Sequence, residues 1–301
     1  MTQTEIVVAE ELALSETIRR RGPVWRMVAR ALRLRRTQVG LAIFVLLLAL
    51  ALIGPLFAPA SPTEFTGLPS SGHSSAAPFG TDNLGRDVFS RFLWGGRSVF
   101  ALTTIATGLG LALGIAVGLV AAYARNRLDD VLMRSMDVIL SFPQIILSLV
   151  AIATVGPKLW LVVVTVAITT MPRVARVVRG AALEVVEREF VQAAEALGES
   201  RPRILLGEVL PSITSPLLVE ASLRFTYTVA LIAGLSFLGF GLQPPRADWG
   251  LMINENRLGI LTSPWGVTLP VIAIGLLTVA TGLVGDGLSR AVAGIDRSKS
   301  E

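Results

Sequence analysis

Residues 39–58 read VGLAIFVLLLALALIGPLFA, a run of twenty residues without a charged side chain. A helix needs about 20 predominantly apolar residues to cross the roughly 30 Å hydrocarbon core of a bilayer. The rest of the chain has the same character, because 52% of its 301 residues are hydrophobic and only 16% are charged. Soluble domains carry about 25% charged residues. The sequence therefore predicts an all-α membrane protein.

Further charge-free windows mark the other expected spans, at 98–124, 138–157, 159–172, 225–245 and 258–285. The window 159–172 is short enough to be a buried or re-entrant segment. Positive charge favours counting it as a span, because twenty of the 27 lysines and arginines then lie in cytoplasmic segments. Without it, the arginine-rich stretch 173–203 would lie outside, against the positive-inside rule. We expect six transmembrane helices with both termini cytoplasmic.

The segment before the first span, residues 1–38, is polar and holds eight arginines between Arg19 and Arg36. Residues 6–36 are expected to form a basic amphipathic helix on the membrane surface. The first apolar run comes too late and is too long for a cleaved signal peptide, so this tail is predicted to be retained. The net charge of +5 does not indicate a nucleic-acid partner, because the basic residues border apolar runs.

The loop after the first span contains PFGTDNLGRDVFSR at 78–91. Thr81 and Asp82 are good helix N-caps, which predicts a short interfacial helix leading into the second span. Its expected apolar face holds Leu84, Val88, Phe92 and Leu93, and its expected polar face holds Arg86, Asp87, Ser90 and Arg91. A calcium loop is the rival interpretation, but the alternating acidic spacing and the closing glutamate are missing.

Gly110, Gly114 and Gly118 recur every four residues in the second span, so they lie on one helix face. Such a face lets a second helix approach closely. A nucleotide-binding glycine loop is the alternative, but it would require GxGxxG spacing after a soluble strand. Close helix packing is the prediction.

Several classes of chemistry lack their residues. The chain has no cysteine, and its single histidine, His73, lies in a Ser/Pro/Gly loop where it is expected to be solvated. Neither Lys158 nor Lys299 follows a glycine, so a Walker phosphate loop is excluded. No catalytic residue, metal site or bound cofactor is predicted.

Four ionisable residues flank apolar runs: Asp137, Glu220, Arg224 and Asp286. Ionisable residues in spans raise a functional hypothesis by default. Local pairing of Arg134 with Asp137 and of Glu220 with Arg224 is the simpler expectation. An intramembrane aspartyl protease would need paired aspartates within the bilayer, and Asp137 and Asp286 are expected near its inner edge.

The stretch REFVQAAEALGESRPRILLGEVLPS, residues 188–212, is charged and rich in alanine between very apolar segments. Its first helix is predicted to end at Gly198, and Ser200 with Pro202 starts a second helix. Ala193, Ala194 and Ala196 leave a bare helix surface that another protein's groove could approach. An ordinary solvated loop is the alternative.

This stretch resembles the cytoplasmic signature loop of ATP-binding-cassette (ABC) importer permeases. That pattern is Glu-Ala-Ala, a glycine four residues after the second alanine, and a later Leu-Pro; Ala193, Ala194, Gly198, Leu210 and Pro211 match it. Gln192 stands where the family prefers glutamate, and Glu195, one turn later, is the candidate substitute. Similar segments occur at 78–91, 130–147, 175–198, 235–253 and 285–288. The likeness covers about residues 75–290 and is to the second permease of the dipeptide/oligopeptide/nickel subfamily.

The resemblance implies the type I importer permease fold in a bacterial inner membrane, with residues 1–38 and 291–301 cytoplasmic. Residues 39–98 would hold the first helix and the extracytoplasmic loop, and 99–290 the permease core with a coupling loop at 180–213. A related second permease, two cytoplasmic ATPase domains holding ATP and Mg²⁺, and an extracytoplasmic binding protein are the implied partners. The implied ATPase-coupling residues are Gln192, Ala193, Ala194, Glu195, Gly198, Leu210 and Pro211.

The implied substrates are di- or oligopeptides, with nickel complexes, glutathione and haem-like ligands open for relatives of this kind. The substrate-binding residues are not indicated. A secondary transporter or channel is the alternative function. It would want coupling carboxylates in mid-membrane and an inverted repeat, and the sequence shows neither.

Overall fold

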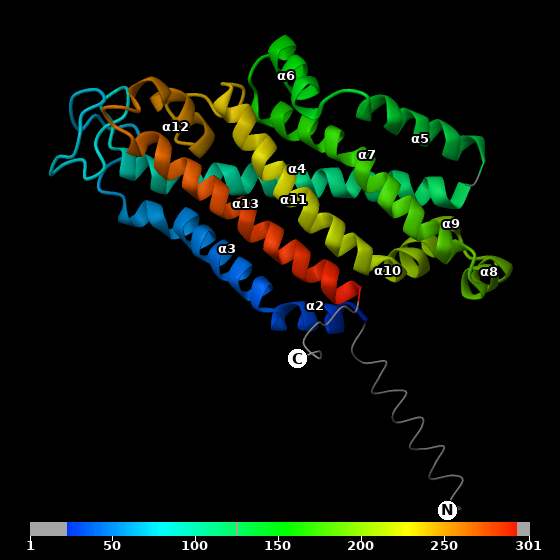
Figure 1. The fold of residues 1–301 in the computed structure, drawn as a ribbon. Coiled ribbons are helices and arrows are strands. Elements are labelled where there is room, and N and C mark those ends of the chain that lie inside the picture. The colour runs from blue at the N-terminus through cyan, green and yellow to red at the C-terminus, as the bar shows by residue number, and fades with distance from the viewer. Residues whose placement is uncertain (1–22, 125, 294–301) are drawn as a thin grey trace, which may run out of the picture.

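The computed structural model describes residues 23–124 and 126–293, and this part of the chain is almost entirely helical (Figure 1). Within it, β-structure is limited to two isolated bridges, Phe65–Arg86 and Thr81–Asp87. The longer helices are α2 (Pro23–Arg33), α3 (Arg35–Ile53), α4 (Val88–Ala124), α5 (Arg127–Leu140), α6 (Gln144–Val155), α7 (Leu159–Val186), α11 (Thr214–Phe237), α12 (Trp249–Asn256) and α13 (Trp265–Val292). The short segments η1 (Gly54–Phe57) and η3 (Arg257–Gly259) are 3₁₀ turns.

Five helical segments are long and apolar enough to cross a membrane: Arg35–Phe57, α4, α7, α11 and α13. A sixth is reached if α5 and α6, bent by 82° at their junction, are counted as one broken span. With the bent pair counted as one span, the number of spans agrees with the expectation of six. The straight span expected at 138–157 is wrong, because Pro143 has no N–H to continue a helix and favours an extended residue before it.

The expected boundaries of other spans are shifted. The window 225–245 corresponds to α11, which begins eleven residues earlier at Thr214. The charge-free criterion cut this helix short, because Glu220 and Arg224 lie inside it as an ion pair with 2.8 Å between Nε and Oε1. The window 159–172 extends to Val186, with Pro172 accommodated inside α7.

Close packing of α4 against α7 confirms the role expected for the glycine face. A Cβ added to Gly114 would lie 2.5 Å from the Val174 Cβ, and one added to Gly118 would lie 2.6 Å from the Ala175 carbonyl oxygen. These distances are below van der Waals contact, so the two helices approach at the spacing that glycine permits.

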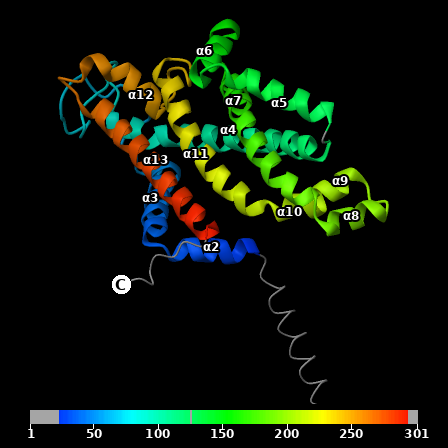
Figure 2. The same ribbon diagram turned by 45° about the vertical axis from the view of Figure 1, so that its right-hand side comes forward.

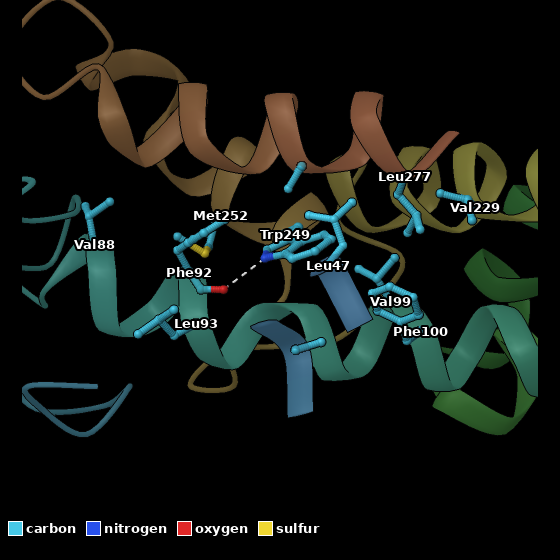
Figure 3. Packing of buried hydrophobic residues seen from close by; sticks show 12 residues of the cluster. Leu47, Val88, Phe92, Leu93, Val99, Phe100, Val229, Trp249, Met252 and Leu277 are labelled. Atoms are coloured by element: carbon cyan, nitrogen blue, oxygen red, sulfur yellow. Dashed lines mark hydrogen bonds between the residues drawn. The ribbon is translucent and has the colours of Figure 1, made fainter. Parts of the chain in front are cut away.

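At one end of the molecule, the cluster around Trp249 joins α12 to the first turns of α4 (Figure 3). Trp249 is fully buried, stacks on Phe92 with 5.6 Å between ring centroids, and donates its indole N–H to the Phe92 carbonyl at 2.9 Å. Gly95 and Gly96 lie directly against its ring. Asp248 caps α12 by accepting from the Leu251 N–H at 3.1 Å, and its burial raises the pKa of its carboxyl group.

The start of α4 differs from the expectation. The helix begins at Val88, and Asp87 caps it by accepting the Ser90 N–H at 2.8 Å. It then runs without a break to Ala124, so no separate short helix precedes it. The expected polar face does not face solvent, because its four residues are all buried: Arg86, Asp87, Ser90 and Arg91.

These buried charges form a closed ring with α12, called here the charge ring (Asp82, Arg86, Arg91 and Glu255). Arg86 Nε lies 2.6 Å from Asp82 Oδ2, and its Nη2 lies 3.1 Å from Glu255 Oε2. Arg91 repeats the pattern at 3.3 Å and 2.6 Å. Each buried charge thus faces two opposite charges, which meets the condition under which ion pairs persist in low dielectric.

The N-terminal helix α2 turns away from the axis of α3, as both views show (Figures 1 and 2). The break is at Leu34, whose backbone is extended (φ −75°, ψ 126°). The single helix expected over 6–36 is therefore interrupted there, and the part of that prediction on residues 6–22 lies outside the described residues.

Candidate functional site

The segment between α7 and α11 projects from the end of the molecule opposite α12, as both views show (Figures 1 and 2). It consists of α8 (Glu189–Ala196), α9 (Arg201–Ile204), the π-helical turn η2 (Leu205–Val209) and α10 (Leu210–Ser212). The second helix expected here is therefore present and runs without a gap from Arg201 to Ser212, with a π-helical turn in its middle. Pro211 contributes to this π-helical turn, because it has no N–H to donate to a carbonyl in the preceding turn.

The first helix of the segment ends as predicted. Gly198 has φ +78°, in the left-handed region that favours glycine. Its N–H donates to the Glu195 carbonyl at 3.0 Å, and the Glu199 N–H donates to the Ala194 carbonyl at 3.1 Å. This pair of bonds is the Schellman motif. The glycine thus fixes the turn that sets α8 against α9.

The projecting segment is packed firmly on the helices below it. Val191, Ile204 and Val209 are buried in a cluster that is completed by side chains of α4, α7 and α11. Polar contacts add to this: the Arg201 guanidinium lies 5.8 Å from the centre of the Tyr123 ring, and the Glu195 carboxylate lies near the Tyr123 hydroxyl. A displacement of the segment would therefore be passed to three membrane-spanning helices.

The outer surface of the segment is apolar in places. Leu197 is 84% exposed, Leu206 62% and Phe190 41%. Fully burying a side chain of this size is worth about 1.5–3 kcal/mol, so this surface favours contact with another protein. Sequence reasoning missed these three residues; their signal was a large apolar side chain in an otherwise charged stretch.

The predicted coupling residues lie around this surface. Gln192, Ala193, Glu195, Gly198 and Pro211 are exposed, whereas Ala194 and Leu210 pack partly against the buried cluster. Gln192 donates its side-chain amide to the Glu187 carbonyl at 3.2 Å. The structure places all seven on or beside α8 and α10, within one compact segment.

A second polar feature, the arginine ladder (Arg173, Arg176 and Arg179), holds α5 and α6 onto α7. Arg179 donates hydrogen bonds to both carboxylate oxygens of Asp129, and the distance from its Nε to Oδ1 is 2.6 Å. Arg176 forms an ion pair with Asp137, and Arg173 donates to the Gln144 side chain at 3.0 Å. The expected Arg134–Asp137 pair is therefore wrong, because a partner on α7 replaces the local one.

The expected local pair of Glu220 with Arg224 is confirmed, with both side chains largely buried in α11. Asp286 is exposed. The His73 ring nitrogen Nδ1 lies 2.9 Å from the Pro78 carbonyl oxygen in the loop before α4. Within the described residues, no group of three or more His, Cys, Asp and Glu side chains could hold a metal ion.

Comparison with known proteins shows the family to which the chain belongs. The model of a family described as "Binding-protein-dependent transport system inner membrane component" matches residues 110–294. The chain is 34% identical over 272 residues to a dipeptide transport system permease protein of Alkalihalophilus pseudofirmus, covering 89% of each chain. It is 36% identical over 271 residues to a glutathione transport system permease protein of Pectobacterium atrosepticum, covering 89% of this chain and 90% of the relative. A di/tripeptide transport system permease protein of Pseudomonas aeruginosa is 35% identical over 260 residues, with 84% and 86% covered.

Proposed function

Because the chain belongs to the family of binding-protein-dependent transport system inner membrane components and is an ABC importer permease of the inner membrane, we propose that it imports small peptides and is driven through residues 187–213. ATP and Mg²⁺ would be held by the ATPase subunits. This chain would contribute half of the pathway and no catalytic residue.

The observation that carries the proposal is the projecting segment. It presents the exposed Leu197 and Leu206 outward, while Val191 and Val209 anchor it to the spans. A surface of this kind suits a cleft in a cytoplasmic ATPase, which would cover the apolar side chains. Because Val191 and Val209 pack against side chains of α7 and α11, movement of the ATPase would tilt these two helices together.

Gln192 changes how the docking is expected to work. The residue is neutral and its amide already bonds within the chain, so it offers no charge to a basic residue of the ATPase. The Glu195 carboxylate lies near the hydroxyl group of Tyr123 on α4. We therefore propose that shape and apolar contact dominate the docking, with Glu195 serving mainly to hold α8 against α4.

A second permease would cover the bent α5–α6 pair. Ser141 and Phe142 are exposed at the break, and non-helical backbone at membrane depth is not left facing lipid. Val138, Ile146 and Val150 form exposed apolar surface on either side of it. This face is the proposed contact between the two permeases and the border of the pathway.

Orientation follows from the docking segment. If residues 187–213 are cytoplasmic, then α2 and the C-terminal end of α13 are cytoplasmic too, whereas α12 and the charge ring face the opposite side. We propose that the binding protein delivers the peptide there. The division into a tail at 1–38, a first helix and loop at 39–98, and a core at 99–290 stays part of this proposal, although α4 runs through the boundary at 98.

The test compares two substitutions of equal chemistry at opposite ends. Leu197→Asp places a charge in the proposed docking surface, and Leu258→Asp does so at a residue that is 90% exposed beside α12. Leu197→Asp is expected to abolish co-purification of the ATPase subunits and peptide uptake while membrane insertion is unchanged. Leu258→Asp is expected to leave co-purification intact. Equal retention of the ATPase by both variants would refute the docking assignment.

A further inference from the structure

A cavity of about 250 Å³ lies where α2 crosses the start of α11 and the end of α13. It is lined by Arg26, Met27, Arg30, Ser215, Ala291 and Val292. The two arginines are one helical turn apart, so both reach it from the same face of α2. The opposite wall comes from residues that are distant in sequence.

The positive charge of this cavity has no acidic counterpart in the part of the chain that the structure describes. None of the described residues that line it is acidic, and among residues 23–124 and 126–293 neither Arg26 nor Arg30 forms an ion pair. Ser215 adds a hydroxyl group that can donate a hydrogen bond. Two guanidinium groups and a hydroxyl group form a donor set that suits the oxygens of a phosphate.

The remaining sides of α2 indicate where that phosphate would come from. Met27 and Ala31 are buried against the protein, whereas Trp25 is 58% and Leu32 42% exposed on another side of the helix. At 100° per residue the exposed apolar side chains share one arc, and the arginines share an arc between them and the buried side. A helix with this division lies in the headgroup region, with its apolar arc in the acyl chains and Trp25 at the interface.

We propose that this cavity binds the phosphate headgroup of an anionic phospholipid in the cytoplasmic leaflet. Basic pockets between transmembrane helices on this side of a membrane are suited to such headgroups. Met27, Ala291 and Val292 supply apolar walls where the acyl chains begin. The placement of α2 in the cytoplasmic leaflet rests on the orientation given under Proposed function.

Binding there would have a mechanical effect. Ser215 is the second residue of α11, and α10 ends three residues before it at Ser212. A lipid held by Arg26, Arg30 and Ser215 therefore ties α2 to the base of the segment that contacts the ATPase. Anionic lipid is expected to stabilise this base and to raise the transport rate in reconstituted membranes.

The test measures binding of fluorescent phosphatidylglycerol to the purified complex. Arg26→Gln with Arg30→Gln removes the two cavity arginines, and Arg33→Gln with Arg36→Gln removes the same charge from exposed residues that do not line the cavity. A charge-assisted hydrogen bond from a cavity arginine to the phosphate is worth at least about fivefold in binding, and Arg33 and Arg36 do not line the cavity where such bonds form. The cavity variant should weaken binding on the order of 20-fold, and the control less than about threefold.

Two other outcomes would overturn the proposal. Equal weakening by both variants would show diffuse attraction to the membrane in place of a site. Inorganic phosphate that displaces the labelled lipid as well as unlabelled phosphatidylglycerol does would assign the cavity to a soluble anion.

A conservative variant, Arg26→Lys with Arg30→Lys, guards against misfolding and should retain most of the binding. Loss of binding in this variant together with a lowered melting temperature would be a folding defect, so lipid binding is then read from Ser215→Glu, which places a carboxylate in the cavity. Retained binding in Ser215→Glu would refute the site. Because lipid binding is measured without transport, the result would still test this cavity even if residues 187–213 proved not to contact the ATPase.

Discussion

Replacing Gly118 with alanine would test whether α4 and α7 are held at the distance that only glycine allows. The new Cβ would lie 2.6 Å from the Ala175 carbonyl oxygen and 2.7 Å from the Val178 Cβ. Neither neighbour can yield easily, since one is backbone and the other is a buried, β-branched side chain. Extra volume in a well-packed core costs about 1–3 kcal/mol.

Gly108 provides the matched control, because it lies on the same helix and an added Cβ there meets no atom within 4 Å. Both substitutions gain the same helix propensity, about 1 kcal/mol, so their difference isolates the packing cost. We expect Gly118→Ala to unfold at a temperature at least about 2 °C below that of Gly108→Ala, measured by thermal unfolding in detergent. Equal melting temperatures would refute the close-packing argument.

Three further predictions concern other parts of the molecule. Gly198→Ala should reduce peptide uptake, because its φ of +78° costs a non-glycine residue about 1–2 kcal/mol; unchanged uptake would show that the turn tolerates strain. Glu255→Gln should lower the free energy of unfolding by about 3–5 kcal/mol, because it leaves Arg91 short of a buried partner, and a smaller loss than that of a surface control such as Glu208→Gln would contradict the charge ring. Burial raises the pKa of the Asp248 carboxyl group above its unfolded value. The contribution of this group to the free energy of unfolding is therefore present below the unfolded pKa and is lost as the pH rises through the folded pKa. Asp248→Asn should therefore flatten that acid-range loss in melting temperature and keep the helix cap, whereas a steeper loss would show that the carboxylate stabilises the fold.

The sequence predicts well where the determining signal is local. Gly110, Gly114 and Gly118 define a helix face by spacing alone, and that face is the one packed on α7. The turn at Gly198 is likewise set by neighbouring residues. The coupling residues could be proposed for the same reason, because QAAEALG is a contiguous motif.

The features that were missed depend on residues far apart in the chain. The sequence pattern predicts that Arg86 and Arg91 lie on a polar, solvent-facing helix surface, because polar residues in an amphipathic pattern usually face water. Their partner Glu255 lies more than 160 residues away, so no local pattern could reveal the charge ring. Asp137 similarly takes its partner from α7, 39 residues on. The length of a charge-free window also carries no information about a bend, so the window 138–157 predicts a straight span although the helix breaks before Pro143.

The charge ring also limits how this permease can be re-engineered. Its positive members come from residues 86 and 91, and one of its negative members comes from α12. A chimera that takes the loop before α4 from one relative and α12 from another would succeed only if both donors carry complementary charges. Segments 78–91 and 248–256 therefore act as one unit of exchange, although 156 residues of chain lie between them.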